Sequence, residues 1–171
     1  KRTKLDGDNY IPSNQLYIKL PDGEKVMFKK ASHFTRSELM VMEMLSTNQW
    51  KRPMYFAVTI GNDYHLGLDP YLELTGMAYR ITPERSEDGR PRVNTAEMYE
   101  NMMHQFRFGN VNQPGIYLDE NTLRMCRTHR MMFAQLAEAL YMEGWQTEDT
   151  LVRKEKHAKA LQVLDYADEM L

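Results

Sequence analysis

The sequence predicts an α+β fold, in which a small mixed β-sheet with packed helices is followed by a C-terminal helical hairpin. Three observations support this prediction. Residues 15–30 alternate between apolar and polar around a turn signal, residues 54–60 form a short run of strand-favouring side chains, and residues after 116 repeat their apolar positions at helical spacing. The chain of 171 residues is long enough to bury such a core without disulfide bonds.

The first predicted element is a β-hairpin. Residues 1–14 are polar and are expected to be irregular. Two alternating segments, Gln15–Leu20 and Lys25–Lys30, then flank the turn signal Pro21-Asp22-Gly23.

A helix is predicted from about residue 36 to 47. Thr35 and Glu38 have the spacing of a capping box, in which each side chain satisfies the other's backbone amide. Leu39, Met42 and Leu45 would then lie on one apolar face.

Two strands are predicted in the middle of the chain. Residues 54–60 are rich in aromatic and β-branched side chains, which favours a strand buried on both faces. Residues 64–75 are expected to form a short helix or loop broken by Pro70, and 77–82 to return as a strand. The charged segment 83–93 is expected to be an exposed loop.

Helices dominate the remainder. One is predicted from Asn94 or Thr95 to about residue 106, one from Asp119 or Asn121 to a C-cap at Gly144, and one over 149–171. The apolar side of the last helix is expected to contain the following residues: Leu151, Ala158, Leu161, Leu164 and Met170. We therefore divide the chain into an α/β portion (1–108), a linker (109–116) and a helical hairpin (117–171).

The last two helices resemble a tetratricopeptide-type pair. The resemblance rests on the segments 136–140 and 159–167 and on Gly144 between them, although residues 145–157 are too long for the turn of that repeat. One such pair cannot bury its apolar face alone, so it is expected to pack on the α/β portion or on further repeats.

Composition excludes several classes of protein. The net charge of −2 shows no basic excess, so neither a nucleic-acid partner nor a general anionic-membrane surface is expected. The longest apolar run, 54–60, is far shorter than the roughly 20 residues of a membrane span. The single cysteine, Cys126, is expected to be a buried, inert thiol rather than a reactive one. The fourteen methionines are expected to fill the core rather than to form a groove that binds a partner.

One candidate ligand site consists of residues at the two ends of the predicted central strand. Trp50 and Arg52 precede it and Asn62, Asp63 and Tyr64 follow it, so these residues could bind a hydroxyl-rich ligand such as a sugar if the strand is central. The alternative is an ordinary turn after a strand, since Gly-Asn-Asp is common turn chemistry.

The spacing of Asp63, His65 and Asp69 allows a metal site. A loop in which the two carboxylates cap backbone amides is the better explanation of this spacing. We therefore expect no metal and no cofactor.

Three arginines repeat every three residues on the long predicted helix: Arg124, Arg127 and Arg130. They could bind an anion such as a phosphate-bearing lipid head group, pair with glutamates of a neighbouring helix, or simply be solvated. No motif of a hydrolase, a phosphate-binding loop, a dinucleotide fold or a zinc protease is present, so no catalytic residue is predicted.

Three segments carry a family resemblance: residues 48–64, 72–81 and 117–125. In this order they resemble the C-terminal soluble region of a family of large bacterial multi-pass membrane proteins, whose N-terminal part is similar to protein O-mannosyltransferases that use lipid-linked sugars. The likeness covers roughly residues 10–171. The catalytic acid of such enzymes lies in the membrane region, so none is transferred to this chain.

The resemblance implies an extracytoplasmic accessory domain that contacts the membrane-embedded region of its parent and a protein or glycan acceptor. A cytoplasmic location is the alternative. Two further hypotheses are a sugar-binding or sugar-processing site near residues 62–64 and a purely structural cap for the membrane region. Because the chain opens Lys1-Arg2-Thr3-Lys4 without an initiator methionine, we expect it to be an excised or processed fragment.

Overall fold

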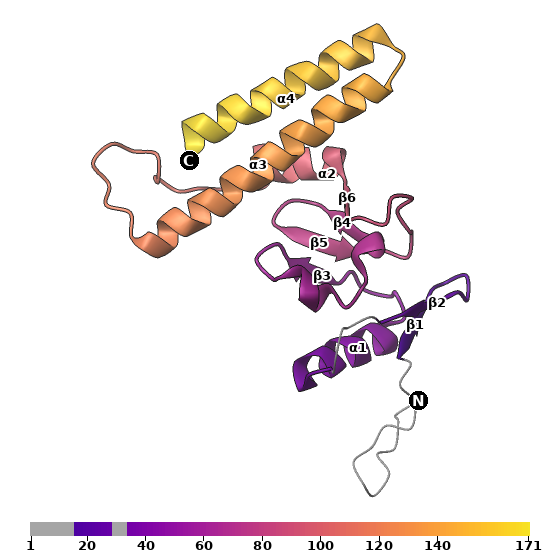
Figure 1. Ribbon diagram of the computed structural model, residues 1–171. Coiled ribbons are helices and arrows are strands. Elements are labelled where there is room, and N and C mark those ends of the chain that lie inside the picture. Colours follow the sequence, from indigo (N-terminus) through magenta and orange to yellow (C-terminus); the bar gives the residue numbers. More distant parts are fainter. Residues whose placement is uncertain (1–15, 29–33) are drawn as a thin grey trace, which may run out of the picture.

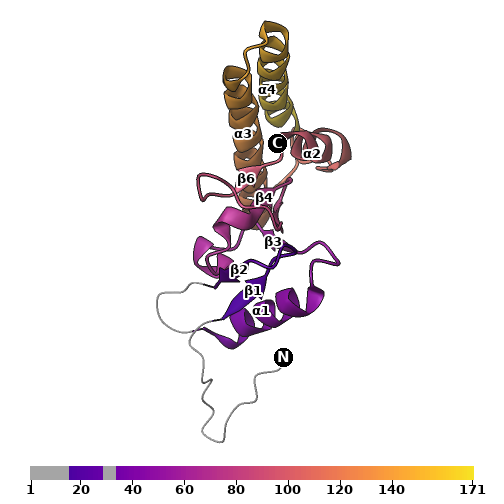
Figure 2. The ribbon, with the colours of Figure 1, turned by 90° about the vertical axis from the view of Figure 1, so that its right-hand side faces the viewer.

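The computed structural model describes residues 16–28 and 34–171, and the elements lie in three tiers (Figure 1). A two-stranded sheet with helix α1 lies at one end of the molecule, and a long helical hairpin lies at the other. A four-stranded sheet lies between them, and the view turned by 90° shows the same order (Figure 2). The α+β class predicted from the sequence is confirmed, including the small mixed sheet and the C-terminal hairpin.

The first tier confirms the predicted hairpin. Strands β1 (Tyr17–Lys19) and β2 (Lys25–Met27) pair antiparallel, with Ile18 opposite Val26. Gly23 has a φ of 93° in the turn between them, a value that favours glycine. The predicted irregular segment 1–14 and the end of the second predicted strand lie outside the described residues.

Helix α1 (Arg36–Asn48) begins with the predicted capping box. Thr35 N–H donates to Glu38 Oε2 at 2.6 Å, and Glu38 N–H donates to Thr35 Oγ1 at 3.4 Å. These bonds satisfy two amides that the helix itself leaves unpaired. Met42 and Leu45 are buried against β1 and β2, so the helix covers one face of the two-stranded sheet.

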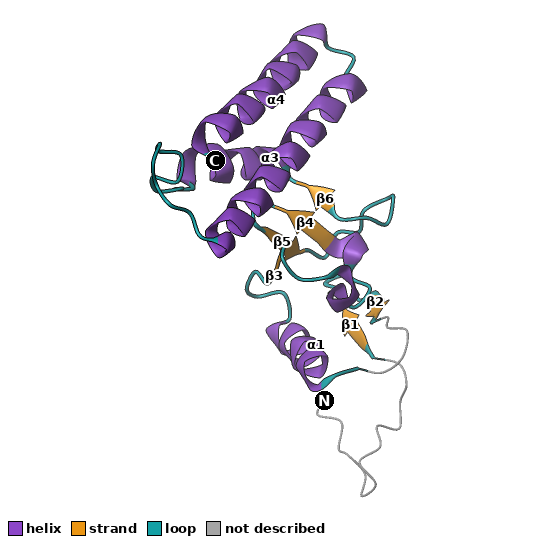
Figure 3. Ribbon diagram, turned by 60° about the vertical axis from the view of Figure 1, so that its left-hand side comes forward, coloured by secondary structure: helices purple, strands orange, loops and turns teal. Residues whose placement is uncertain are grey.

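The second tier is a mixed sheet with the order β3-β5-β4-β6 (Figure 3). Its strands are β3 (Tyr55–Ala57), β4 (Leu72–Leu74), β5 (Ala78–Ile81) and β6 (Arg92–Val93). The pairs β3–β5 and β5–β4 are antiparallel, and β4–β6 is parallel.

The strand predicted over 54–60 is not buried on both faces. β3 is an edge strand of three residues, and only Phe56 is buried, whereas Tyr55 is 48% exposed. The run ends early because the backbone turns after Ala57, whose carbonyl accepts from Ile60 N–H. Aromatic and β-branched residues favour strands on either an edge or a central position, so composition alone could not decide between them.

Two strands lie where none was predicted. β4 follows two 3₁₀ turns, Asn62–His65 and Asp69–Tyr71, within the segment predicted as helix or loop. β6 lies in the segment predicted as an exposed loop, where it pairs with β4. Strands of two and three residues are too short to show a period-2 pattern, so pairing with neighbours decides them.

The third tier begins with α2 (Thr95–Glu100), which continues as a π-helical turn (Asn101–Gln105). The hairpin follows, with α3 (Glu120–Gln146) and α4 (Thr150–Met170). Asp119 caps α3 as predicted, since its carboxylate accepts from Thr122 N–H at 2.7 Å. No helix among the described residues is long and apolar enough to cross a membrane.

Gly144 is not the C-cap of α3. The helix continues to Gln146, two residues past the predicted end, whereas α4 begins at Thr150 after its N-cap Asp149, as predicted. Gly144 is buried where α4 crosses it, and an added Cβ would lie 2.7 Å from the His157 ring. Its small size is therefore used for helix–helix contact, which sequence cannot distinguish from a terminating glycine.

Buried apolar residues form two cores. The first joins α1, β1 and β2 to the outer part of the larger sheet, through residues such as Leu66 and Leu72. The second joins Leu74 of β4 and Met98 of α2 to the hairpin, where Phe133 and Leu136 are fully buried. The second core therefore includes residues on both sides of the predicted linker at 109–116.

The methionines divide between core and surface. Met42, Met98, Met102 and Met132 are buried, as core filler should be, but other methionines are exposed. The exposed ones among the described residues are Met40, Met44, Met125, Met131 and Met142. Cys126 is buried, as predicted.

The predicted apolar side of α4 faces outward. Leu151, Leu161 and Leu164 are exposed, whereas Ala160 and Val163 pack against α3. Small side chains let the two helix axes approach closely, so the face of α4 that carries Ala160 and Val163 is the buried one.

Candidate functional site

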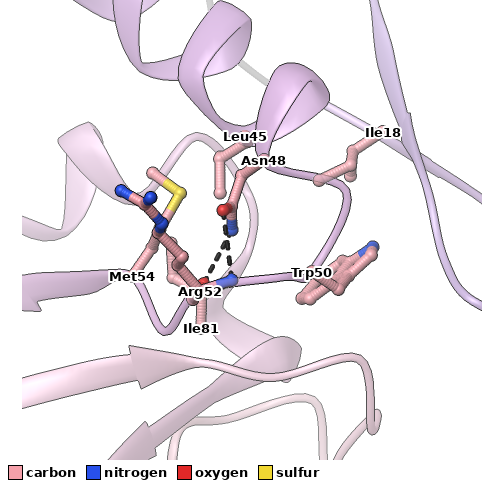
Figure 4. A pocket seen from close by; sticks show the side chains of 7 residues that line it. All are labelled: Ile18, Leu45, Asn48, Trp50, Arg52, Met54 and Ile81. Atoms are coloured by element: carbon pink, nitrogen blue, oxygen red, sulfur yellow. Dashed lines mark hydrogen bonds between the residues drawn. The ribbon is translucent and has the colours of Figure 1, made fainter.

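The predicted sugar site separates into two parts at opposite ends of β3. Trp50 and Arg52 line a shallow depression at the start of this strand, between α1 and the larger sheet (Figure 4). The other residues of its lining are Ile18, Leu45, Asn48, Met54 and Ile81. The depression holds about 10 Å³, room for about one water molecule, so it does not enclose a sugar ring.

The polar side chains of Asn48 and Trp50 in this depression bond to backbone groups of the protein. Asn48 Nδ2 donates to the Arg52 carbonyl at 2.7 Å, and Arg52 N–H donates to Asn48 Oδ1 at 3.2 Å, as Figure 4 shows. Trp50 Nε1 donates to the Lys19 carbonyl at 2.8 Å. Gln49 and Trp50 have φ values of 48° and 61°, so these bonds hold a sharp left-handed turn that joins α1 to β3.

The other part of the predicted site lies on the first 3₁₀ turn. Asn62, Asp63 and Tyr64 are all exposed, and none of them lines the depression. The turn has no side-chain cap. Because β3 is at the sheet edge, its C-terminal end does not open into the kind of crevice that a central strand would provide.

His65 and Asp69 come together, but without Asp63. His65 is 1% exposed, and its Nδ1 lies 2.8 Å from Asp69 Oδ1. Its ring stacks on Phe56 and meets Tyr79 edge-on, both at 5.5 Å between centroids. An ionised carboxylate can only accept hydrogen bonds, so His65 Nδ1–H donates to Asp69. This bond orients the His65 ring inside the first core.

The neighbouring Tyr79 has a shifted pKa. Burial, together with the negative charge of Asp69, raises the pKa of the Tyr79 hydroxyl above its usual value. In the part of the chain that the structure describes, no three His, Cys, Asp or Glu side chains gather to hold a metal ion.

A charged network that was not predicted crosses the larger sheet. Arg80 on β5 donates to Glu73 on β4, and its Nη2 lies 2.8 Å from Glu97 Oε2 on α2. The hydrogen bond to Glu73 is the main cause that raises the pKa of Arg80. Glu73 and Arg80 are opposite each other in the β4–β5 register, so the network fixes the sheet to α2. No sequence pattern indicated this network, because β4 was not predicted.

The three predicted anion-binding arginines lie on the outer side of α3, near its N-terminal end. Arg124, Arg127 and Arg130 are all exposed, and Arg124 Nη2 donates to Asn121 Oδ1 at 3.2 Å. None of the ion pairs formed between described residues includes any of the three. Their charges are therefore directed to solvent rather than to glutamates of a neighbouring helix.

Exposed apolar side chains share this side of α3. Helical spacing places them in line with the arginines, and we call the combined surface the arginine face. Its exposed apolar members are Leu123, Met131, Tyr141, Met142 and Trp145. The face is thus basic toward the start of α3 and aromatic toward its end.

The aromatic end is held by α4. His157 stacks on Tyr141 with 4.6 Å between centroids, and the Arg153 guanidinium lies 5.3 Å from the centre of the Trp145 ring. Arg153 also donates to the Thr147 carbonyl at 2.9 Å. These contacts fix Tyr141 and Trp145 in place while leaving about half of each side chain exposed.

Residues 22–100 match the family model of the TMEM260-associated domain 2. The match covers β2 to α2, just under half of the chain, and it does not include the hairpin. No curated protein and no solved structure matches the chain. The family match is consistent with a domain of a TMEM260-like membrane protein.

Proposed function

We propose that this chain is an accessory domain of a TMEM260-like membrane protein, where it mediates contact with a partner and catalyses no reaction itself. The observation that carries the proposal is the match of residues 22–100 to a domain defined by its association with TMEM260. The resemblance of the sequence to membrane proteins with an O-mannosyltransferase-like part extends the proposal. The parent is then a glycosyltransferase-like protein, and this domain lies on the extracytoplasmic side.

The arginine face of α3 is the surface that we propose for contact. Its partner is the phosphate-bearing surface of the membrane in which the parent is anchored. Each arginine near an anionic surface contributes about 1 kcal/mol, so Arg124, Arg127 and Arg130 supply about 3 kcal/mol. That is weak for a free protein but sufficient to orient a domain that is already tethered to the membrane.

The apolar members of the face favour a membrane over a dissolved anion. Tyr and Trp are the side chains that settle at the membrane–water interface, where an apolar ring and a polar group both find partners. Tyr141 and Trp145 occupy the end of α3 beyond the arginines, and both are half exposed. The overall net charge of −2 adds no attraction, so binding must depend on this local face.

Vesicle co-sedimentation tests the contact. The chain is mixed with vesicles of phosphatidylcholine alone or with phosphatidylglycerol added. We expect binding only to the anionic vesicles, and a loss of binding when Arg124, Arg127 and Arg130 are all replaced by Gln. A matched control replaces three exposed basic residues elsewhere, Lys25, Lys51 and Arg52, and should bind as the unmodified chain does. If both triple variants lose vesicle binding equally, binding depends only on total charge, and the proposal that the arginine face makes the contact is contradicted.

The accessory role needs the whole parent protein. Replacing the three arginines there should leave its abundance in the membrane unchanged while reducing glycan transfer to its acceptor. If abundance falls and the activity per molecule is unchanged, the domain is a structural cap instead. If abundance and activity are both unchanged, the face has no part in the function.

A further inference from the structure

Helix α4 has two apolar faces, and the larger side chains are on the exposed one. The buried face consists of small residues, Ala160, Val163 and Ala167. The outer face carries Leu151 and Leu161, which are 76% and 64% exposed, and Leu164 lies between the two faces and is 46% exposed. Exposed leucines grouped on one side of a helix mark a contact surface.

The outer face also has the spacing of a coiled coil. Six exposed positions on it recur at alternating intervals of three and four residues, the spacing of a coiled-coil seam, and three of the six are apolar. The stripe consists of Leu151, Lys154, Ala158, Leu161, Asp165 and Asp168.

Charge along this stripe selects the occupant. Lys154 lies toward the N-terminal end and Asp165 and Asp168 toward the C-terminal end, with Ala158 and Leu161 between them. Among the described residues, these three charged groups form no ion pair with another side chain, whereas Glu155 and Lys159 beside them pair with each other at 2.7 Å. A surface that is basic at one end and acidic at the other is complementary to itself when a second copy lies antiparallel.

We propose that two copies of this chain associate through the outer faces of α4, antiparallel and related by a twofold axis that passes between Lys159 and Ala160. This arrangement sets Lys154 against the partner's Asp165. It also sets Leu161 against the partner's Ala158, so that a large side chain meets a small one. The contact is on a different helix face from the arginine face, and it does not depend on the proposed function.

The size of the stripe indicates a weak dimer. From residue 151 to 168 the helix rises about 26 Å. A stable dimer commonly buries about 800 Å² on each partner, and one helix face of this length offers less. We therefore expect a dimer that forms at concentrations of roughly tens of micromolar and above.

Sedimentation equilibrium of the whole chain tests the dimer. Over about 1 µM to 1 mM, the average mass should rise from 20.2 kDa toward twice that value. Leu161→Asp should weaken association by about 100-fold or more, because two leucine contacts are lost per dimer. Met40→Asp is the matched control, since Met40 is 66% exposed on α1 at the opposite end of the molecule, and it should associate normally.

Charge reversal tests the antiparallel register. Lys154→Glu or Asp165→Lys alone places like charges together at both ends of the contact and should weaken association by about 10-fold. An equal mixture of the two variants should form a heterodimer, because each contact is again between opposite charges. The double variant should likewise recover self-association.

Three outcomes overturn the proposal. A mass of 20.2 kDa at every concentration excludes the dimer. A dimer that Leu161→Asp does not weaken uses another surface. Failure of the mixed charge variants to recover association, while each alone is weakened, excludes the antiparallel register. Circular dichroism of each variant should match the unmodified chain, because the replaced side chains are exposed and make no core contact.

Discussion

Replacing Gly144 with Ala should destabilise the protein, against the usual preference of a helix for alanine. Away from contacts, this change in a helix interior stabilises by about 1 kcal/mol. Here the new Cβ would lie 2.7 Å from Cδ2 and Nε2 of His157 and 3.3 Å from Lys156 Cβ. The histidine ring cannot move away freely, since it stacks on Tyr141 at 4.6 Å and lies 5.6 Å from the Trp145 ring.

The balance of these terms gives the expected magnitude. Overpacking of a tight contact costs about 1–3 kcal/mol, which exceeds the gain in helix propensity. We expect a net loss of about 1 kcal/mol in the free energy of unfolding, which lowers the melting temperature by about 2–4 °C. Urea denaturation followed by circular dichroism measures the change.

A double-mutant cycle isolates the steric cause. In a His157→Ala background the ring is absent and only the 3.3 Å contact with Lys156 Cβ remains, so the cost of Gly144→Ala should fall by about 1 kcal/mol or more. Ala134→Gly, at an exposed position of the same helix, gives the propensity difference without the contact. The reasoning is refuted if Gly144→Ala stabilises the unmodified chain, or if its effect is the same in both backgrounds.

Other predictions follow from the same structure. Asp69→Ala should cost about 1–3 kcal/mol of stability, because it leaves the buried His65 Nδ1–H without its acceptor; Asp69→Asn should recover part of the loss in urea denaturation, and equal losses would contradict this role. Phe133→Ala should cost about 3–5 kcal/mol in the same assay, because the ring is 0% exposed in the second core; a loss under 1 kcal/mol would place the core elsewhere. The hydrogen bond from Thr122 N–H lowers the pKa of Asp119, so its stabilisation of α3 is fully present above the ordinary carboxyl pKa and is lost as pH falls through the lowered value. An NMR titration of this carboxyl should report a pKa below the ordinary one, and an ordinary or raised pKa would exclude the cap.

Local signals in the sequence determined the helix starts and the first hairpin. Thr35 and Glu38 form the capping box that their spacing predicted, and Asp119 caps α3. Such features involve residues a few positions apart, so the chain encodes them without reference to the rest of the fold. The same is true of the turn at Gly23 between β1 and β2.

The candidate sites depended on more distant relations. The sequence predicted that Arg124, Arg127 and Arg130 would lie along one helix flank, and local periodicity is enough for that. It could not place Trp50 and Asn62 relative to each other, because their separation depends on β3 being an edge strand. Position within a sheet is decided by strand pairing: β3 pairs with β5, and β4 takes the other side of β5, so β3 is left at the edge by strands that lie further along the chain.

Tertiary structure alone decided which apolar face of each helix is buried. Leu161 and Ala160 are neighbours on α4, and hydrophobicity by itself favours burial of the leucine. The close crossing of α3 and α4 accepts only small residues, so Ala160 is buried and Leu161 is left exposed. The sequence thus determined where helices begin and that α4 carries apolar residues along its length. The packing distance between two helices decided which side of α4 is buried and which is left open to a partner.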